Sequence, residues 1–178
     1  IQEQVSAEAR TTVALPVSLI KPALPMEDAP NMGVKELVAQ QHTVFKGSSE
    51  SRVKNITLAA ARFNNVLIPP GGVFSFNDHL GEVSKETGYD ESLVILGDST
   101  VVGYGGGVCQ VSTTAFRTAL FGGFPIDERY AHAYVVGWYG EPGMDATVYA
   151  PYTDFRFRNN TDHYVMIMTD VDAEAGTI

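Results

Sequence analysis

The sequence predicts an α+β domain in which an antiparallel sheet packs against a few helices. Apolar residues recur at helical spacing from about residue 52 to 67 and again from about residue 108 onward. The last third of the chain instead alternates short apolar runs with turns, which is typical of strands. The 17 glycines and 9 prolines also favour many turns over long helices. Helices first and a series of strands afterwards indicate the α+β class.

Residues 1–42 are expected to be the end of a preceding module and a connector. Two β-prone runs within residues 11–20 come before three prolines, a pattern typical of a strand followed by an extended segment. A short helix is expected over 34–41. The main domain is then expected to span 43–178.

The clearer helix is predicted over 52–67. Ser51 is a candidate N-cap, and the Pro-Pro-Gly-Gly run at 69–72 ends the helix. After it, residues 73–76 predict a strand. The apolar residues within 93–103, on either side of a Gly-Asp turn, predict a hairpin.

A second helix is predicted to begin near Val108 and to stop at Gly122 and Gly123. Beyond this stop the chain predicts one short strand after another, separated by glycine, proline and asparagine turns. The expected strands cover residues 126–130, 132–138, 146–149, 154–158 and 164–169.

The single cysteine, Cys109, follows three consecutive glycines at the start of the second predicted helix. In a first helical turn, free N–H groups and the helix dipole favour a thiolate, the nucleophilic form of cysteine. The alternative is a buried structural cysteine, since cysteine is among the most frequently buried residue types. Phosphate binding is not expected, because the loop lacks the third glycine of a dinucleotide fingerprint and a Walker lysine.

Net charge narrows the choice of partners. The formal charge is −9, and the 12 lysines and arginines are scattered, whereas nucleic-acid binding requires clustered cations. A basic partner or a neutral wall polymer fits this composition better. The sequence has no apolar run near the ~20 residues of a membrane span and no signal sequence. Because it starts at Ile1 rather than at methionine, we expect a fragment, with any membrane anchor outside it.

A histidine and an aspartate complete a candidate catalytic site with Cys109. A cysteine nucleophile needs a nearby base, and the base needs a third group to orient it. His132 opens one predicted strand and Asp145 begins the next, so an antiparallel hairpin would place them side by side. The structural alternatives are a hydrogen-bonded core histidine and a turn-capping aspartate.

Other residues are candidates for holding substrate or an oxyanion. This set contains donors near the thiol, hydroxyls of the helix and aromatic residues that would line a groove: Gly107, Gln110, Ser112, Thr113, Tyr104 and Trp138. No metal site or cofactor is expected, because the sequence lacks the paired ligand spacing of a zinc site.

The order of cysteine, histidine and aspartate resembles the transglutaminase-like, papain-type group of cysteine enzymes. In that group the nucleophile begins a helix, and the histidine and aspartate lie on adjacent strands. The local motifs that carry the resemblance are Gly-Val-Cys at 107–109, Gly-Phe-Pro-Ile at 123–126, His-Ala-Tyr-Val at 132–135 and Asp-Ala-Thr at 145–147. Two features depart from the group: the interval from cysteine to histidine is short, and Gln110 replaces a frequent aromatic residue.

Residues 43 to about 170 are similar to the VanW family. The matching blocks occur in order at 52–56, 70–77, 105–114, 128–132, 145–148 and 154–161, and the third reads Gly-Gly-Gly-Val-Cys-Gln-Val-Ser-Thr-Thr. The family takes its name from glycopeptide-resistance gene clusters and often follows a peptidoglycan-binding module, whose end residues 1–42 resemble. The resemblance implies the bacterial cell envelope as the setting.

Two functions follow as hypotheses. In the first, the chain is an extracytoplasmic cysteine enzyme that transfers or hydrolyses acyl groups at peptide or amide bonds of cell-wall material, with Cys109 as nucleophile, His132 as proton shuttle and Asp145 as orienting group. In the second, it is a non-catalytic module whose glycine loop and aromatic residues bind a wall peptide or glycan. The sequence does not indicate an oligomeric state.

Overall fold

The computed structural model describes residues 26–178, except 98 and 141. The chain divides into two compact units, Ile1–Met32 and Gly33–Ile178. In the described part of the first unit lies one short 3-10 helix, η1 (Met26–Asn31). The β-prone runs expected within residues 11–20 lie outside the described residues.

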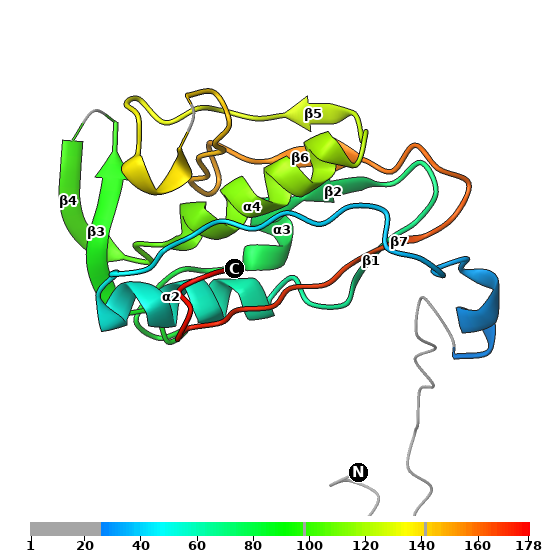
Figure 1. Ribbon diagram of the computed structural model, residues 1–178, viewed down its shortest axis with the longest axis horizontal. Helices are drawn as coiled ribbons and strands as arrows, with labels where there is room; N and C mark the ends of the chain where they lie inside the picture. The colour runs from blue at the N-terminus through cyan, green and yellow to red at the C-terminus, as the bar shows by residue number, and fades with distance from the viewer. Residues whose placement is uncertain (1–25, 98, 141) are drawn as a thin grey trace, which may run out of the picture. The chain divides into compact units, whose positions relative to one another are not determined.

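The second unit combines helices with small antiparallel sheets, which confirms the α+β fold (Figure 1). Its helices are α2 (Glu50–Ala61), α3 (Phe76–Leu80), α4 (Val108–Phe121) and the 3-10 helix η2 (Gly137–Tyr139). Its strands are β1 (Val66–Ile68), β2 (Val73–Ser75), β3 (Glu91–Leu96), β4 (Ser99–Tyr104), β5 (Ile126–Glu128), β6 (Arg156–Arg158) and β7 (Val165–Ile167). Instead of one sheet, they form three: β1–β7, β2–β6–β5 and β3–β4.

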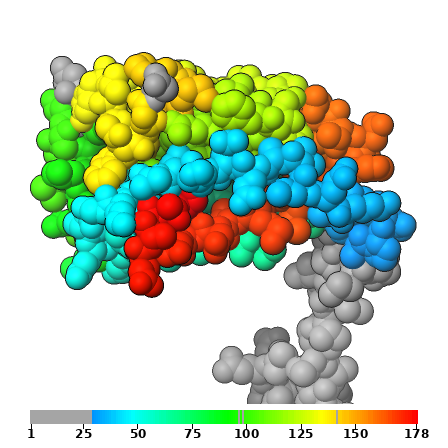
Figure 2. Space-filling model, viewed as in Figure 1, coloured from blue at the N-terminus to red at the C-terminus, as the bar shows by residue number. Residues whose placement is uncertain are grey.

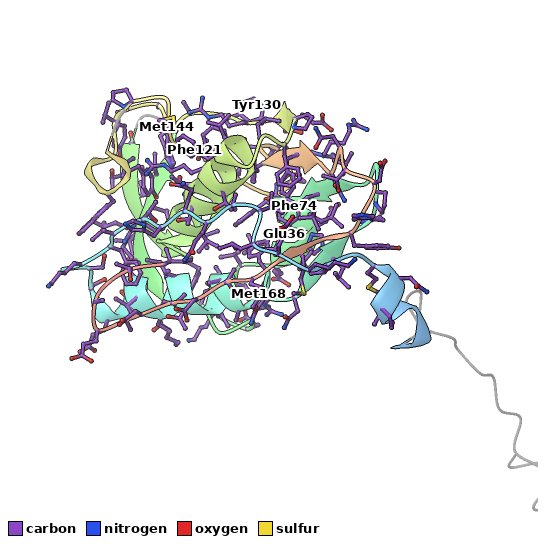
Figure 3. The ribbon with its side chains drawn as sticks, turned by 45° about the vertical axis from the view of Figure 1, so that its right-hand side comes forward. Glu36, Phe74, Phe121, Tyr130, Met144 and Met168 are labelled. Atoms are coloured by element: carbon purple, nitrogen blue, oxygen red, sulfur yellow. The ribbon has the colours of Figure 1, made fainter. Side chains whose placement is uncertain are left out.

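An aromatic core holds these small sheets to the helices. Phe74 of β2 pairs with Phe157 of β6, and their ring centroids lie 5.0 Å apart. Phe116 of α4 meets Phe155 edge-on at 5.9 Å, which ties the helix to the same core. Figure 3 shows Phe74 in the interior of the domain. Burial of each such side chain contributes about 1.5–3 kcal/mol, so this cluster stabilises the position of α4.

Helix α4 begins at Val108, which confirms the predicted start. Gly107 is its N-cap, and the Gly122 N–H donates to the Thr118 carbonyl at 2.9 Å at the other end. Helix α2 packs against α4, and the β3–β4 hairpin, also confirmed, stands at one end of the helices (Figure 1). The glycine loop that leads into α4 therefore lies where hairpin and helices meet.

Helix α2 differs from its prediction at both ends. Its N-cap is Ser49 rather than Ser51, and the Ser49 hydroxyl accepts a hydrogen bond from the Arg52 N–H at 3.3 Å. The helix ends at Ala61, and the residues predicted as its last turn form β1 instead. Apolar residues continue across this boundary because β1 also faces the core, where Ile68 is buried.

The helix expected over 34–41 is wrong. The segment 33–49 has no helix and crosses one face of the unit beside the C-terminal residues (Figure 2). The Thr43 N–H donates to the Ile178 carbonyl at 2.9 Å and the Phe45 N–H to the Gly176 carbonyl at 2.7 Å. These bonds pair the chain with the C-terminal residues just after residues 34–41, which form no helical turn.

The strand expected over 132–138 is also wrong, because these residues form a loop that leads into η2. Residues 146–149 make only isolated bridges, such as that between Thr147 and Tyr130. The other late strands are confirmed in shorter form as β5, β6 and β7. Alternating side chains in 132–138 therefore reflect a loop anchored at several points rather than a strand.

Candidate functional site

Cys109 lies at the second position of α4 and is partly buried. Gly107, the N-cap, has a φ of 117°, and a Cβ there would come within 2.9 Å of Ile56 Cγ1 and 3.0 Å of the Arg52 carbonyl. Only glycine allows this left-handed conformation and this close approach to α2. The first turn of α4 has no acidic residue and no side-chain cap, so its dipole acts on the thiol without a competing negative charge.

Asn55 of α2 holds the glycine loop in place. Its amide nitrogen donates to the Gly106 carbonyl at 3.1 Å and to the Asp90 carbonyl at 3.0 Å, and its oxygen accepts the Asp90 N–H at 2.8 Å. Asn55 is fully buried. The sequence interpretation gave this residue no role in the site. Asn55 lies four residues before the buried Ala59, on the same face of α2, and this spacing was the available signal that its amide faces inward.

The structure brings His132 and Asp145 together. One carboxylate oxygen, Asp145 Oδ2, accepts the His132 main-chain N–H at 2.8 Å and lies 2.5 Å from the ring Nδ1. The other oxygen accepts Arg129 Nη2 at 3.1 Å, and Arg129 Nε also donates to the Asp145 carbonyl at 2.6 Å. The His132 side chain is only 1% exposed. Asp145 thus fixes the ring and directs its Nε2 away from the carboxylate.

The thiol of Cys109 is the second partner of the imidazole. The Cys109 thiol and the His132 imidazole interact, and each shifts the pKa of the other. The sulfur also lies 3.8 Å from Thr147 Oγ1 and 3.7 Å from the Val148 carbonyl. Because Nδ1 faces Asp145, Nε2 is the ring nitrogen left for the thiol. Cysteine, histidine and aspartate therefore form one continuous chain of contacts.

Electrostatics in this chain of contacts favour the charged forms. Burial by itself raises the pKa of the Cys109 thiol, but the hydrogen bond and charge of His132 outweigh burial and lower this pKa. Burial likewise opposes protonation of His132, yet Cys109 and Asp145 raise its pKa. Burial opposes ionisation of Asp145, and the bonds from His132 together with the charge of Arg129 lower its pKa. The pair is biased toward a thiolate and an imidazolium.

Ser112 and Thr113 support this arrangement from helix α4. The Ser112 hydroxyl donates to the Ala146 carbonyl at 2.6 Å, and the Ala146 N–H donates to Thr113 Oγ1 at 3.1 Å. Both side chains are fully buried. The structure therefore places these two predicted substrate contacts against the residue that follows Asp145, where they fix the carboxylate relative to α4.

Gln110 is engaged inside the protein. Its Oε1 accepts Arg52 Nη2 at 2.8 Å, its Nε2 donates to Thr43 Oγ1 at 2.7 Å, and its main-chain N–H donates to the Gly107 carbonyl at 2.9 Å. The side chain predicted to hold an oxyanion instead anchors an arginine. Arg52, which the sequence interpretation did not single out, lies four residues before the buried Ile56 and so shares its face of the helix.

The two predicted aromatic residues lie on different elements. Tyr104 ends β4 opposite Glu91 and is partly exposed. Trp138, in η2, is 40% exposed and its ring lies under the Arg52 guanidinium at 5.0 Å. Of the two, only Trp138 has a contact that leads toward the thiol.

A pocket of about 210 Å³ lies against the loop that carries the histidine. Its lining includes His132, Tyr139 and Asp145. Within the described residues, no group of histidine, cysteine, aspartate and glutamate side chains has the arrangement of a metal site. In the same part of the chain, no helix is long and apolar enough to cross a membrane.

Comparison with known proteins places this site in a family. The chain is 35% identical over 155 residues to the uncharacterized protein YoaR of Bacillus subtilis strain 168, an alignment that covers 87% of this chain and 50% of YoaR. It is 34% identical over 131 residues to the vancomycin B-type resistance protein VanW of Enterococcus faecalis strain V583, covering 70% of this chain and 47% of that protein. The chain thus spans about half the length of these relatives. No solved structure matches it significantly.

The family model described as VanW like protein matches residues 51–178. This range includes the glycine loop, the thiol and its histidine and aspartate partners. The chain belongs to the VanW family.

Proposed function

We propose that this chain is a cell-envelope thiol enzyme that transfers or hydrolyses acyl groups at peptide or amide bonds of cell-wall material. The observation that carries the proposal is the chain of contacts from Cys109 through His132 to Asp145. The thiol sits at a helix start, the imidazole is held in one orientation by two bonds to the carboxylate, and the pKa of the thiol is lowered. These are the requirements of nucleophilic cysteine catalysis.

In the proposed reaction, the Cys109 sulfur attacks the substrate carbonyl after passing its proton to His132. The resulting oxyanion develops near the start of α4, where the helix dipole offers partial positive charge. As the carbon–nitrogen bond breaks, His132 returns the proton to the leaving amine and a thioester remains on Cys109. Water or a second amine then attacks the thioester, His132 takes up the proton of this nucleophile, and the thiol is restored.

The relatives support the cell envelope as the proposed location of this chain. The name of the Enterococcus protein connects it with vancomycin B-type resistance, and the resemblance to the VanW family implies the cell envelope as the setting. A wall peptide or glycan is therefore the partner that we propose, and an extracytoplasmic location goes with it. We also propose that residues 1–42 are the end of a wall-associated module that precedes the domain of residues 43–178.

A non-catalytic wall-binding module is the second candidate, and one observation favours it. Tyr149 and Tyr152 are 55% and 78% exposed, and their rings stack with centroids 6.1 Å apart and 16° between planes. This pair follows Val148, whose carbonyl contacts the thiol. Exposed aromatic faces suit the apolar faces of sugar rings, so the pair fits a glycan beside the thiol.

The experiment that separates the two candidates is turnover of purified wall fragments. The chain is incubated with muropeptides, and products are followed by mass spectrometry for the wild type, Cys109→Ala and the matched surface variant Asp162→Asn. The enzyme proposal expects cleaved or newly joined peptides from the wild type and Asp162→Asn, and none from Cys109→Ala. Fragments that bind equally well to all three proteins and remain unchanged would favour the module instead.

A further inference from the structure

The guanidinium of Arg52 is partly buried and is held only by neutral groups. Arg52 Nη1 donates to Ser48 Oγ at 2.8 Å and Nη2 to Gln110 Oε1 at 2.8 Å, and the Tyr139 side chain is close enough to act on the pKa of Arg52. The ion pairs among the described residues are Lys54–Asp90, Arg129–Asp145, His132–Asp145 and Arg158–Asp127, and none includes Arg52. A buried cation without a counter-charge costs free energy.

This cation lies next to the proposed reaction centre. Gln110, which binds it, follows Cys109 in the chain, and the charge of the thiolate acts on the guanidinium. Tyr139 acts electrostatically on Arg52 and also packs on the His132 ring, with ring centroids 5.1 Å apart. Arg52 and Cys109 are both partly exposed, as a ligand that contacts both requires.

The surroundings of Arg52 hold the guanidinium in one orientation. Arg52 Cζ lies 5.0 Å from the centroid of the Trp138 ring, and Ser48 and Gln110 bind two nitrogens of the guanidinium. If Arg52 served only to hold Gln110 in place, it would not need a charge, because Thr43 also holds Gln110. A counter-ion for the thiolate is already supplied by His132, whose pKa is raised. The charge of Arg52 is therefore available to a ligand.

We propose that Arg52 recognises a carboxylate of the acyl-donor substrate, specifically the C-terminal carboxylate of a wall stem peptide whose scissile carbonyl reaches Cys109. A planar guanidinium matches a carboxylate in shape and charge. The formal charge of the chain is −9, so its overall field repels an anionic peptide, and recognition requires a local cation. The inference rests on the proposed function, because it assumes that the same groove holds the acyl donor.

The test is a binding measurement that does not depend on turnover. In the Cys109→Ala background, Trp138 is the only tryptophan and lies on the guanidinium, so its fluorescence reports a ligand at Arg52. The probes are a wall stem tetrapeptide with a free C-terminal carboxylate and the same peptide as its C-terminal amide. We expect the free acid to bind at least about 10-fold more tightly than the amide, the scale of a charge-assisted hydrogen bond.

Variants assign that preference to Arg52. Arg52→Gln should reduce the preference to about one, and Arg52→Lys should keep part of it. Lys54→Gln removes another cation of α2, which is exposed and paired with Asp90, and should leave the preference unchanged. Circular dichroism melting of each variant separates lost binding from lost folding. If Arg52→Gln does not fold, two other measurements replace it: the acid preference of Arg52→Lys, and the weakening of the wild-type preference at high salt.

Equal binding of acid and amide by the parent protein, absence of binding of either peptide, or a preference that survives Arg52→Gln would each overturn the inference. Its failure is distinct from that of the proposed function. A chain that turns over both peptides equally keeps the enzyme and loses the carboxylate site. A chain that prefers the acid through Arg52 but never turns it over keeps the site and loses the enzyme.

Discussion

Replacing Asp145 by asparagine removes a charge while keeping the shape of the side chain. Asp145 accepts the His132 N–H, faces the ring Nδ1 and accepts Arg129 Nη2, and its side chain is mostly buried. Asparagine keeps one oxygen, so one or two charge-assisted bonds are lost, each worth about 1.5–3 kcal/mol. We expect the free energy of unfolding to fall by about 2–5 kcal/mol at neutral pH.

The same substitution acts on the thiol through the imidazole. Asp145 raises the pKa of His132, and protonated His132 lowers the pKa of Cys109. Without the carboxylate the imidazolium is less populated, so the thiol pKa rises toward its free value of ~8.5. Turnover of wall fragments should fall by about 10²–10⁴-fold, the contribution of a well-oriented general base.

Two assays measure these effects. Urea unfolding gives the stability difference, and the rate of iodoacetamide labelling against pH gives the apparent pKa of Cys109. Because the pKa of Asp145 is lowered in the folded state, its stabilisation is present above its unfolded pKa and is lost as pH falls through the folded pKa. The stability gap between wild type and Asp145→Asn should therefore close in acid, below a pH of about 4.

Asp162→Asn, an exposed change of the same chemistry, is the control. It should change the free energy of unfolding by less than about 0.5 kcal/mol and leave the apparent pKa of Cys109 unchanged. A labelling profile for Asp145→Asn that coincides with the wild-type profile would refute the reasoning. It would mean that the carboxylate does not act on the thiol through His132.

Three further changes test the supports of the site. Ser112→Ala leaves the buried Ala146 carbonyl without its 2.6 Å bond and should lower the free energy of unfolding by about 1–3 kcal/mol in urea titration. Gly107→Ala, at a φ of 117° against Ile56, should cost more than Gly123→Ala, at a φ of 77° with open space around it, by differential scanning calorimetry. Asn55→Leu frees the glycine loop and should speed amide hydrogen exchange in residues 103–108.

Each of these has an outcome that contradicts it. Ser112→Ala with unchanged stability would mean that the bond to Ala146 is replaced by another. Equal melting temperatures for the two glycine variants would contradict the close packing of Gly107 on α2. Unchanged exchange after Asn55→Leu would show that the loop is held by its glycine geometry alone.

The parts of the site that the sequence predicted correctly depend on local pattern. A glycine run before a helical apolar repeat placed Cys109 at the start of α4, and this needed no knowledge of distant residues. The β3–β4 hairpin was predictable for the same reason, because a two-residue turn pairs strands that are adjacent in the chain. The helix expected over 34–41 does not form, because so short a helix needs packing to be stable and its apolar residues Leu37 and Val38 are exposed.

The loop over 132–138 shows why the rest could not be predicted. Its alternation is typical of a strand, but its conformation depends on distant partners: His132 is held by Asp145, and Tyr134 shares a 2.5 Å hydrogen bond with Thr100. The sequence predicted that an antiparallel hairpin brings His132 and Asp145 together, and the structure has one antiparallel bridge in that register, between Tyr130 and Thr147. The place of Arg52 was equally hidden, because Gln110 is 58 positions away.

The most direct test of the central claim is the search for an acyl-enzyme on Cys109. Wild-type chain is mixed with wall stem peptides, quenched in acid and measured by intact-mass and peptide mass spectrometry. The account predicts an adduct with the mass of the acyl fragment, mapped to Cys109, released by hydroxylamine and absent in Cys109→Ala and His132→Ala. Turnover of the peptides without any adduct on Cys109, or an adduct that persists in His132→Ala at the wild-type rate, would contradict it.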